Sequence, residues 1–147
     1  MAADIRIAKK NAGKIGLPEV TLGVLPGTGG TQRLARIVGK PRAIEMMATG
    51  ATFSFEEAQA MGLVNHVWDA EGFEAKLMEY ARQFVPPGKA AKAVGRIKRA
   101  VQSGLEVSFS ESLAIERELQ QQLFTSEDAR EGLNAYVEKR PAKFTGK

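Results

Sequence analysis

The 147-residue chain has the length of one ordinary domain, and its 44% apolar and 26% charged residues are typical of a folded protein. The absence of cysteine excludes a disulfide scaffold, a thiol nucleophile and a zinc–thiolate site, and it favours a cytoplasmic location. The net charge of +4 suits nucleic acid, an anionic membrane or a phosphorylated small molecule, yet the sequence has neither a nucleic-acid motif nor an apolar run near the roughly 20 residues of a membrane helix.

The first part of the chain, up to about residue 52, is rich in glycine and β-branched residues. In chain order, it predicts a short strand at 4–8, a turn at 9–14, an irregular strand and loop at 15–22, a tight loop at 23–30 and a helix at 31–38. The irregularity at 15–22 comes from Pro18, which removes a backbone donor, and the helix at 31–38 ends at Gly39.

Helical periodicity dominates the remainder, and capping residues mark its boundaries. The predicted elements are a helix at 41–49 closed by Gly50, a helix between a Ser54–Glu57 capping box and Gly62, a strand at 63–68, helices at 71–85, 89–103 and 108–124, and a last helix capped by Thr125 and Asp128. This order predicts an α/β fold that is mostly α, with residues 1–70 and 71–147 as its two parts. The helices expose wide apolar stripes, so we expect them to pack against further sequence, a second copy, or both.

Glu19 is a candidate acid or base. It lies between Pro18, which restricts the local backbone, and the stiff side chain of Val20. A carboxylate held among apolar residues can transfer protons in catalysis. The alternative is an exposed glutamate at the end of a strand, where most glutamates are found.

The glycine-rich loop at 23–30 has a similar ambiguity. Its backbone N–H groups would suit a water molecule or an oxyanion at the start of a helix. It is neither a phosphate-binding Walker loop nor a dinucleotide fingerprint, because the required lysine and glycine spacing are missing. A tight turn in which glycines permit close packing explains the same residues.

Other polar residues favour structural roles. His66 is the only histidine and lacks serine and aspartate partners in a catalytic pattern, while Asp69 and Glu71 lack metal-ligand spacing with it. We therefore expect no metal. The basic stretch 89–99 is interpreted as a solvated face, although it would also suit a phosphorylated molecule.

The motifs together resemble the enoyl-CoA hydratase/isomerase (crotonase) family. The resemblance rests on Asp4-Ile-Arg-Ile-Ala, on Gly16-Leu-Pro-Glu-Val-Thr-Leu-Gly, on Leu25-Pro-Gly-Thr-Gly-Gly-Thr-Gln-Arg-Leu, and on Glu131-Gly132 before Glu138-Lys-Arg-Pro. It implies part of a crotonase-type (ClpP-like) spiral sheet, followed by a C-terminal helical region used in oligomerisation. It also implies an acyl-CoA thioester substrate, no separate cofactor, and a trimer or hexamer in full-length form.

The same resemblance implies roles for individual residues. In the hydratases two glutamates hold a water over the double bond of a 2-enoyl-CoA, and Glu19 matches the one that protonates the α-carbon. In isomerases this position shuttles a proton along the acyl chain. Gly27, with Pro26 beside it, matches a glycine whose N–H lies near the catalytic water. Phe144 and Lys147 lie where family members reach CoA, and the alternative for them is a frayed terminus.

The family's second glutamate and both oxyanion-hole donors fall, by family spacing, upstream of Met1. Two interpretations follow. The chain is the C-terminal portion of a hydratase or isomerase, or it is a catalytically incompetent fragment that acts only as a helical assembly module. Because the loss of one oxyanion donor typically costs about 10²–10³ in rate, we expect little hydratase activity from residues 1–147 alone.

Overall fold

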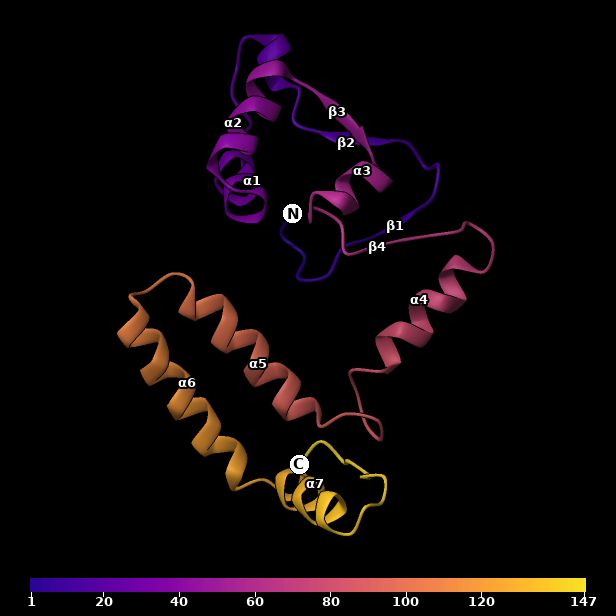
Figure 1. Ribbon diagram of the computed structural model, residues 1–147, viewed down its shortest axis with the longest axis vertical. Coiled ribbons are helices and arrows are strands. Elements are labelled where there is room, and N and C mark those ends of the chain that lie inside the picture. Colours follow the sequence, from indigo (N-terminus) through magenta and orange to yellow (C-terminus); the bar gives the residue numbers. More distant parts are fainter. The chain divides into compact units, whose positions relative to one another are not determined.

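The computed structural model describes residues 1–147, which divide into two compact units, Met1–Phe73 and Glu74–Lys147 (Figure 1). The division falls at the start of a helix, whereas the sequence predicts a boundary between residues 70 and 71. The roles expected for the two parts, an enzyme core and an oligomerisation region, stay predictions.

The first unit contains short strands and helices connected by tight turns. Its elements are β1 (Ile7–Lys9), β2 (Lys14–Gly16), the 3₁₀ turn η1 (Glu19–Leu22), α1 (Gly30–Val38), α2 (Lys40–Thr49), β3 (Thr52–Ser54), α3 (Phe55–Ala60) and β4 (His66–Trp68). β1 pairs with β4 in parallel, with Ala8 opposite Val67. β2 pairs with β3 in antiparallel orientation, with Ile15 opposite Phe53. The unit is therefore a mixed α/β arrangement with two small pieces of sheet, and the α/β fold class expected from the sequence is confirmed.

The helix boundaries in this unit follow the capping residues. Gly50 ends α2 with a φ of 65°, a left-handed conformation that glycine adopts without strain. The hydroxyl of Ser54 accepts from the Glu57 N–H at 3.1 Å, and the Glu57 carboxylate accepts from the Ser54 N–H at 2.7 Å. The predicted capping box is thus confirmed at the start of α3.

A single apolar core holds the first unit together. Its buried members come from β1, α1, α2, α3 and the segment before β4: Ala8, Leu34, Ala43, Met46, Ala58, Leu63 and Val64. α1 packs on α2, and α2 also contacts η1. α2 therefore contributes to this core and also contacts the turn that carries Glu19.

The second unit consists of helices. They are α4 (Phe73–Arg82, whose first residue belongs to the first unit), α5 (Ala91–Gly104), α6 (Phe109–Phe124) and α7 (Glu127–Val137). α5 packs along α6. None of the helices in the chain combines the length and the apolar character needed to cross a membrane.

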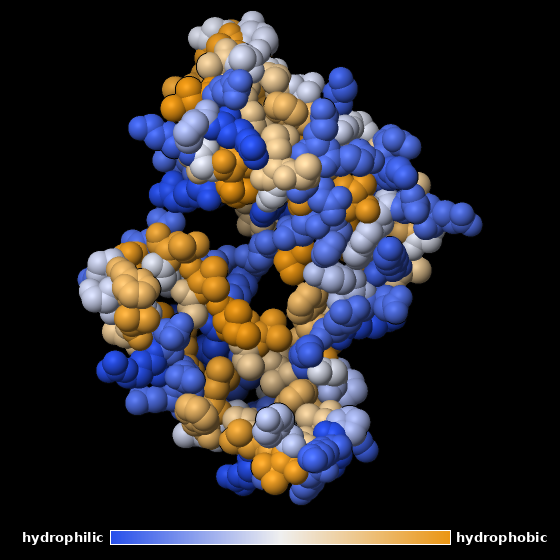
Figure 2. Space-filling view, viewed as in Figure 1, coloured by the Kyte–Doolittle hydropathy of each residue, from blue (hydrophilic) through white to orange (hydrophobic).

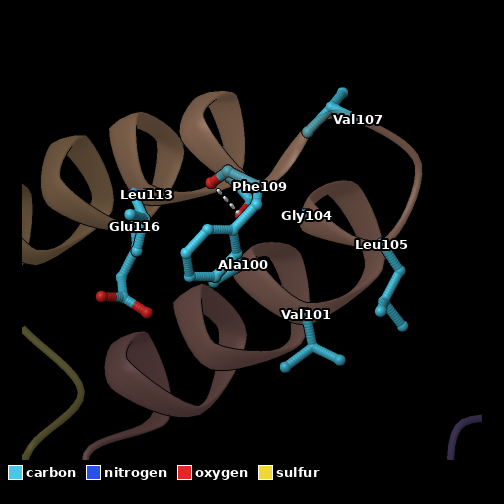
Figure 3. A pocket seen from close by; sticks show the side chains of 9 residues that line it. Ala100, Val101, Gly104, Leu105, Val107, Phe109, Leu113 and Glu116 are labelled. Carbon is cyan, nitrogen blue, oxygen red and sulfur yellow. Dashed lines mark hydrogen bonds between the residues drawn. The ribbon is translucent and has the colours of Figure 1, made fainter.

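Few apolar side chains are buried in the second unit, where Leu119 and Ala135 are among the buried residues. Many large ones are exposed, among them Ile97, Val101, Leu105, Phe109, Phe124 and Leu133, and apolar surface is visible over these helices in Figure 2. Where α5 ends and α6 begins, such side chains line a hollow of about 480 Å³ together with Ala100 and Leu113 (Figure 3). The expectation of exposed apolar stripes is confirmed.

The cap predicted for the last helix is wrong in its residues. Thr125 has helical φ and ψ and ends α6, whereas Ser126 is extended and begins α7. The Ser126 hydroxyl accepts from the Ala129 N–H at 3.1 Å, which is the capping bond. Asp128 does not cap the helix, because its carboxylate binds the segment that follows α7.

Candidate active site

Glu19 is the first residue of η1 and follows Pro18 directly. The N–H and the hydroxyl of Thr21 both donate to the Pro18 carbonyl, at 2.9 and 2.8 Å, and so close the turn. The Glu19 side chain is half-buried, and its Oε2 atom is buried without a hydrogen-bond partner. A buried carboxylate oxygen with no partner lowers stability, so this group is better explained by a ligand than by folding.

Close backbone approaches hold the turn in place. A side chain at Gly50 would put its Cβ 3.2 Å from methyl carbons of both Val20 and Thr21. A Cβ at Gly16 would lie 2.7 Å from the carbonyl oxygen of Ala51. Glycine at these two positions therefore lets the end of α2 and the start of β3 pack against the segment that carries Glu19.

The loop between η1 and α1 contains Pro26 and Gly27, which differ in environment. Pro26 is buried, and a Cβ at Gly30 would lie only 2.9 Å from the Pro26 Cβ. Gly27 is exposed, and a Cβ there would meet nothing within 4 Å. Packing within the chain thus requires glycine at position 30 but not at position 27, where the close approach of a ligand would explain it.

These environments predict that two alanine substitutions differ in their effect on stability. Gly30→Ala should lower the free energy of unfolding by about 1–3 kcal/mol, because the new methyl group must displace Pro26. Gly27→Ala should change it by less than about 0.5 kcal/mol. Urea unfolding of the two variants checks this, and equal destabilisation would contradict the assignment of Gly27 to an open surface.

Phe144 and Lys147 lie in the second unit, in the segment after α7. We call residues 140–147 the strap. The Phe144 ring packs over Gly132 of α7, where a Cβ would lie 3.4 Å from the ring. The backbone N–H of Phe144 donates to the Pro87 carbonyl at 3.2 Å. The Lys147 carbonyl accepts from the Asp128 N–H at 3.1 Å, while Lys147 is exposed. The strap is therefore docked on α7 and not frayed.

Two carboxylates of α7 hold the strap, and neither role was predicted from the sequence. Asp128 is only 3% exposed and accepts from the N–H groups of Thr145 and Gly146 at 2.7 and 2.8 Å. Glu131 forms a two-point ion pair with the Arg140 guanidinium, at 2.6 and 2.9 Å. Their spacing of three residues, which puts them on one helix face, is the signal that was available in the sequence.

The Glu131 pair predicts a pH effect on stability. The hydrogen bonds from Arg140, followed by the Lys143 N–H, lower the pKa of Glu131 from 4.5 to about 2. Because the pKa is lower in the folded state, the stabilisation is fully present above about pH 4.5 and is lost as the pH falls towards 2. Glu131→Gln should therefore lose less stability than the wild type between pH 4.5 and 2.

Unfolding followed by circular dichroism across that pH range measures this difference. Glu127→Gln, which changes an exposed carboxylate on the same helix, is the control and should keep the wild-type slope. Identical slopes for Glu131→Gln and the wild type would contradict the prediction.

His66 and Asp69, for which the sequence favours structural roles, contact neighbouring side chains. The His66 ring stacks on Trp68 with ring centroids 5.6 Å apart, and Trp68 in turn contacts Phe73. Asp69 forms an exposed ion pair with Lys10 at 3.8 Å. No group of three or more histidine, aspartate or glutamate side chains is arranged to hold a metal ion.

The structure thus places the predicted residues in two separate groups. Glu19, Pro26 and Gly27 share the stretch from η1 to the start of α1 in the first unit. Phe144 and Lys147 belong to the strap of the second unit. The first group carries the only unpartnered buried carboxylate oxygen, and we therefore regard it as the candidate catalytic group.

The sequence is similar to proteins of known families over its whole length. An enzyme from Mycosarcoma maydis named as an enoyl-CoA isomerase/hydratase is 40% identical across 100% of this chain and 53% of its own length. A mitochondrial methylglutaconyl-CoA hydratase of Mus musculus is also 40% identical, across 99% of this chain and 47% of its own length. The chain spans about half the length of these curated relatives.

Solved structures give the same result. An enoyl-CoA hydratase of Geobacillus kaustophilus superposes with a TM-score of 0.93 at 48% identity, and the match covers 99% of this chain and 55% of that one. One from Bacillus anthracis superposes with a TM-score of 0.90 at 37% identity, with the same coverage. The family model described as enoyl-CoA hydratase/isomerase matches residues 1–147. The chain therefore belongs to the enoyl-CoA hydratase/isomerase family.

Proposed function

We propose that this chain contributes Glu19 as the acid–base group of an active site that hydrates a 2-enoyl-CoA thioester or shifts its double bond. The observation that carries the proposal is the Glu19 Oε2 atom, which is buried and has no hydrogen-bond partner in the folded chain. Membership of the family supplies the substrate class. The alternative, a helical assembly module without chemistry, gives no reason for a buried, unpartnered carboxylate at this turn.

The proposed chemistry assigns one proton to Glu19. In hydration, the hydroxyl of a water molecule bonds to the β-carbon while the proton that the water loses passes to the second glutamate that the family resemblance implies. The thioester carbonyl takes up negative charge as an enolate, and protonated Glu19 delivers a proton to the α-carbon. In isomerisation, the same carboxylate removes a proton from one carbon of the acyl chain and returns it to another. The Gly27 N–H, exposed on the neighbouring loop, would hold the water next to Pro26. Hydration of crotonyl-CoA by an enzyme carrying Glu19→Gln tests the assignment.

Lys147 has a proposed role in binding CoA. Its ammonium group is on an exposed residue of a docked strap, where a phosphate group of CoA has free access. The same strap carries Phe144, but the packing of its ring over Gly132 gives that residue a structural task as well. A separate cofactor is not part of the proposal, because CoA belongs to the substrate. A cytoplasmic location stays a prediction, since the Mus musculus relative is named as mitochondrial.

We also propose that the chain forms a homo-oligomer through the exposed apolar face of α5 and α6. The Phe109 side chain is 78% exposed, and it lines the hollow at the junction of these helices (Figure 3). Large exposed apolar areas in folded proteins commonly mark interfaces. A full-length trimer or hexamer is the state that the family resemblance implies.

A charge on this face should weaken the assembly. Phe109→Asp is expected to lower the molar mass measured by light scattering by at least one protomer, because it would bury an unpaired carboxylate. The helix content should stay unchanged, since the side chain is exposed within the protomer. An unchanged molar mass would show that another surface makes the contact.

A further inference from the structure

The strap is attached to α7 mainly through its backbone. Asp128 accepts from two consecutive backbone N–H groups, those of Thr145 and Gly146, and its own N–H donates to the Lys147 carbonyl. The Thr145 hydroxyl adds a longer bond to the same carboxylate, at 3.3 Å. These bonds bracket the last three residues and fix the backbone of Lys147, while they leave its ammonium group unconstrained.

The bonds to Asp128 are specific to a carboxylate. Both of its oxygens accept from strap N–H groups, one oxygen for each of Thr145 and Gly146. An asparagine offers only one acceptor oxygen, so its NH₂ group would face an N–H donor. The residue is 3% exposed, and water therefore has little room to replace the lost bond. Gly146 has a φ of 87°, which lets the chain turn back towards α7.

We infer that Asp128 is a positioning residue, which binds the strap to α7 and so holds Lys147 where it meets the phosphates of CoA. This inference rests on the proposed role of Lys147. Its physical basis is that a side chain carried by an already ordered backbone loses less conformational freedom on binding than one on a mobile terminus. Glu131 and Arg140 secure the start of the strap, whereas Asp128 secures the end that carries Lys147.

The test compares CoA with pantetheine, which lacks the nucleotide phosphates. Calorimetry gives the Kd of each compound for the wild-type protein, Asp128→Asn, Lys147→Ala and the double variant. Lys147→Ala should raise the Kd for CoA by about fivefold, the size typical of an exposed ion pair, and leave that for pantetheine unchanged. Asp128→Asn should do the same. The double variant should also stay near fivefold, whereas independent effects would multiply to about 25-fold.

A second measurement reports on the strap directly. Because proteases cleave locally opened segments, we expect trypsin to cut after Lys143 faster when the strap leaves α7. Mass spectrometry of the shortened chain measures the rate of this cleavage. Asp128→Asn should speed this cleavage, and Glu127→Gln, which alters a neighbouring exposed carboxylate, should not. Thr145→Pro removes one N–H donor from the strap side and keeps α7 intact, so it replaces Asp128→Asn if that variant fails to fold.

The outcomes distinguish the positioning role of Asp128 from the proposed contact between Lys147 and CoA. If Lys147→Ala weakens CoA binding but Asp128→Asn releases the strap without any effect on binding, the positioning role is overturned and the Lys147 contact stands. If Asp128→Asn weakens binding without faster cleavage, anchoring is not its mechanism and the inference is also overturned. If Lys147→Ala changes nothing, or the wild type does not bind CoA, both the contact and the inference are wrong.

Discussion

Glu19→Gln is expected to lower kcat for the hydration of crotonyl-CoA by about 10²–10⁴, the usual contribution of a positioned acid or base. Glutamine has nearly the same shape but can neither deliver nor accept the proton. The measurement requires an active enzyme, obtained by joining residues 1–147 to the preceding part of the Geobacillus kaustophilus relative, which matches this chain over 55% of its length. The exposed Glu45 on α2 provides the matched control, and Glu45→Gln should keep the full rate.

The same substitution should leave the fold intact. Because Glu19 Oε2 has no hydrogen-bond partner and glutamine has nearly the same shape, the substitution removes no hydrogen bond from the folded chain. We therefore expect the free energy of unfolding to stay equal or to rise slightly, as is common for residues kept for activity at the expense of stability. If Glu19→Gln retained the full hydration rate, Glu19 would have no part in the mechanism. If Glu19→Gln lost activity because it unfolded, the catalytic role of Glu19 would have no support.

Leu34→Ala should lower the free energy of unfolding by about 2–5 kcal/mol, the largest stability effect that we expect from a single substitution here. Leu34 is 3% exposed and belongs to the core formed by α1, α2 and α3. Removing its side chain leaves a cavity in this core. Leu22→Ala is the matched control, since Leu22 is 78% exposed and its loss should cost less than about 0.5 kcal/mol. Similar midpoints for the two variants in urea would show that α1 is not packed as described.

The helices of this fold were predictable because local residues mark their ends. Gly50 closes α2, and the Ser54–Glu57 capping box opens α3, each through bonds between residues a few positions apart. The strand β3 was not predicted. It is three residues long and exists because it pairs with β2, nearly 40 residues earlier in the chain. Pairing at such a distance leaves no periodic signal in a segment this short.

The candidate site shows the same limit. The sequence indicated Glu19 through its neighbours Pro18 and Val20, and the family motif strengthened the hypothesis. That Oε2 is buried without a partner depends on the packing of the turn, which includes the approach of Gly50, and the sequence does not reveal this. Asp128 was interpreted as a helix cap from its position, because its partners Thr145 and Gly146 lie 17 and 18 residues further along the chain.

The contact between Gly50 and the turn of Glu19 has a consequence for engineering this protein. A side chain added at Gly50 would press on the methyl carbons of Val20 and Thr21, one and two residues beyond the carboxylate. Directed evolution for a changed temperature optimum should therefore select substitutions near Gly50 as readily as substitutions that touch the substrate. The packing at the end of α2 would then determine how rigidly the Glu19 side chain is positioned.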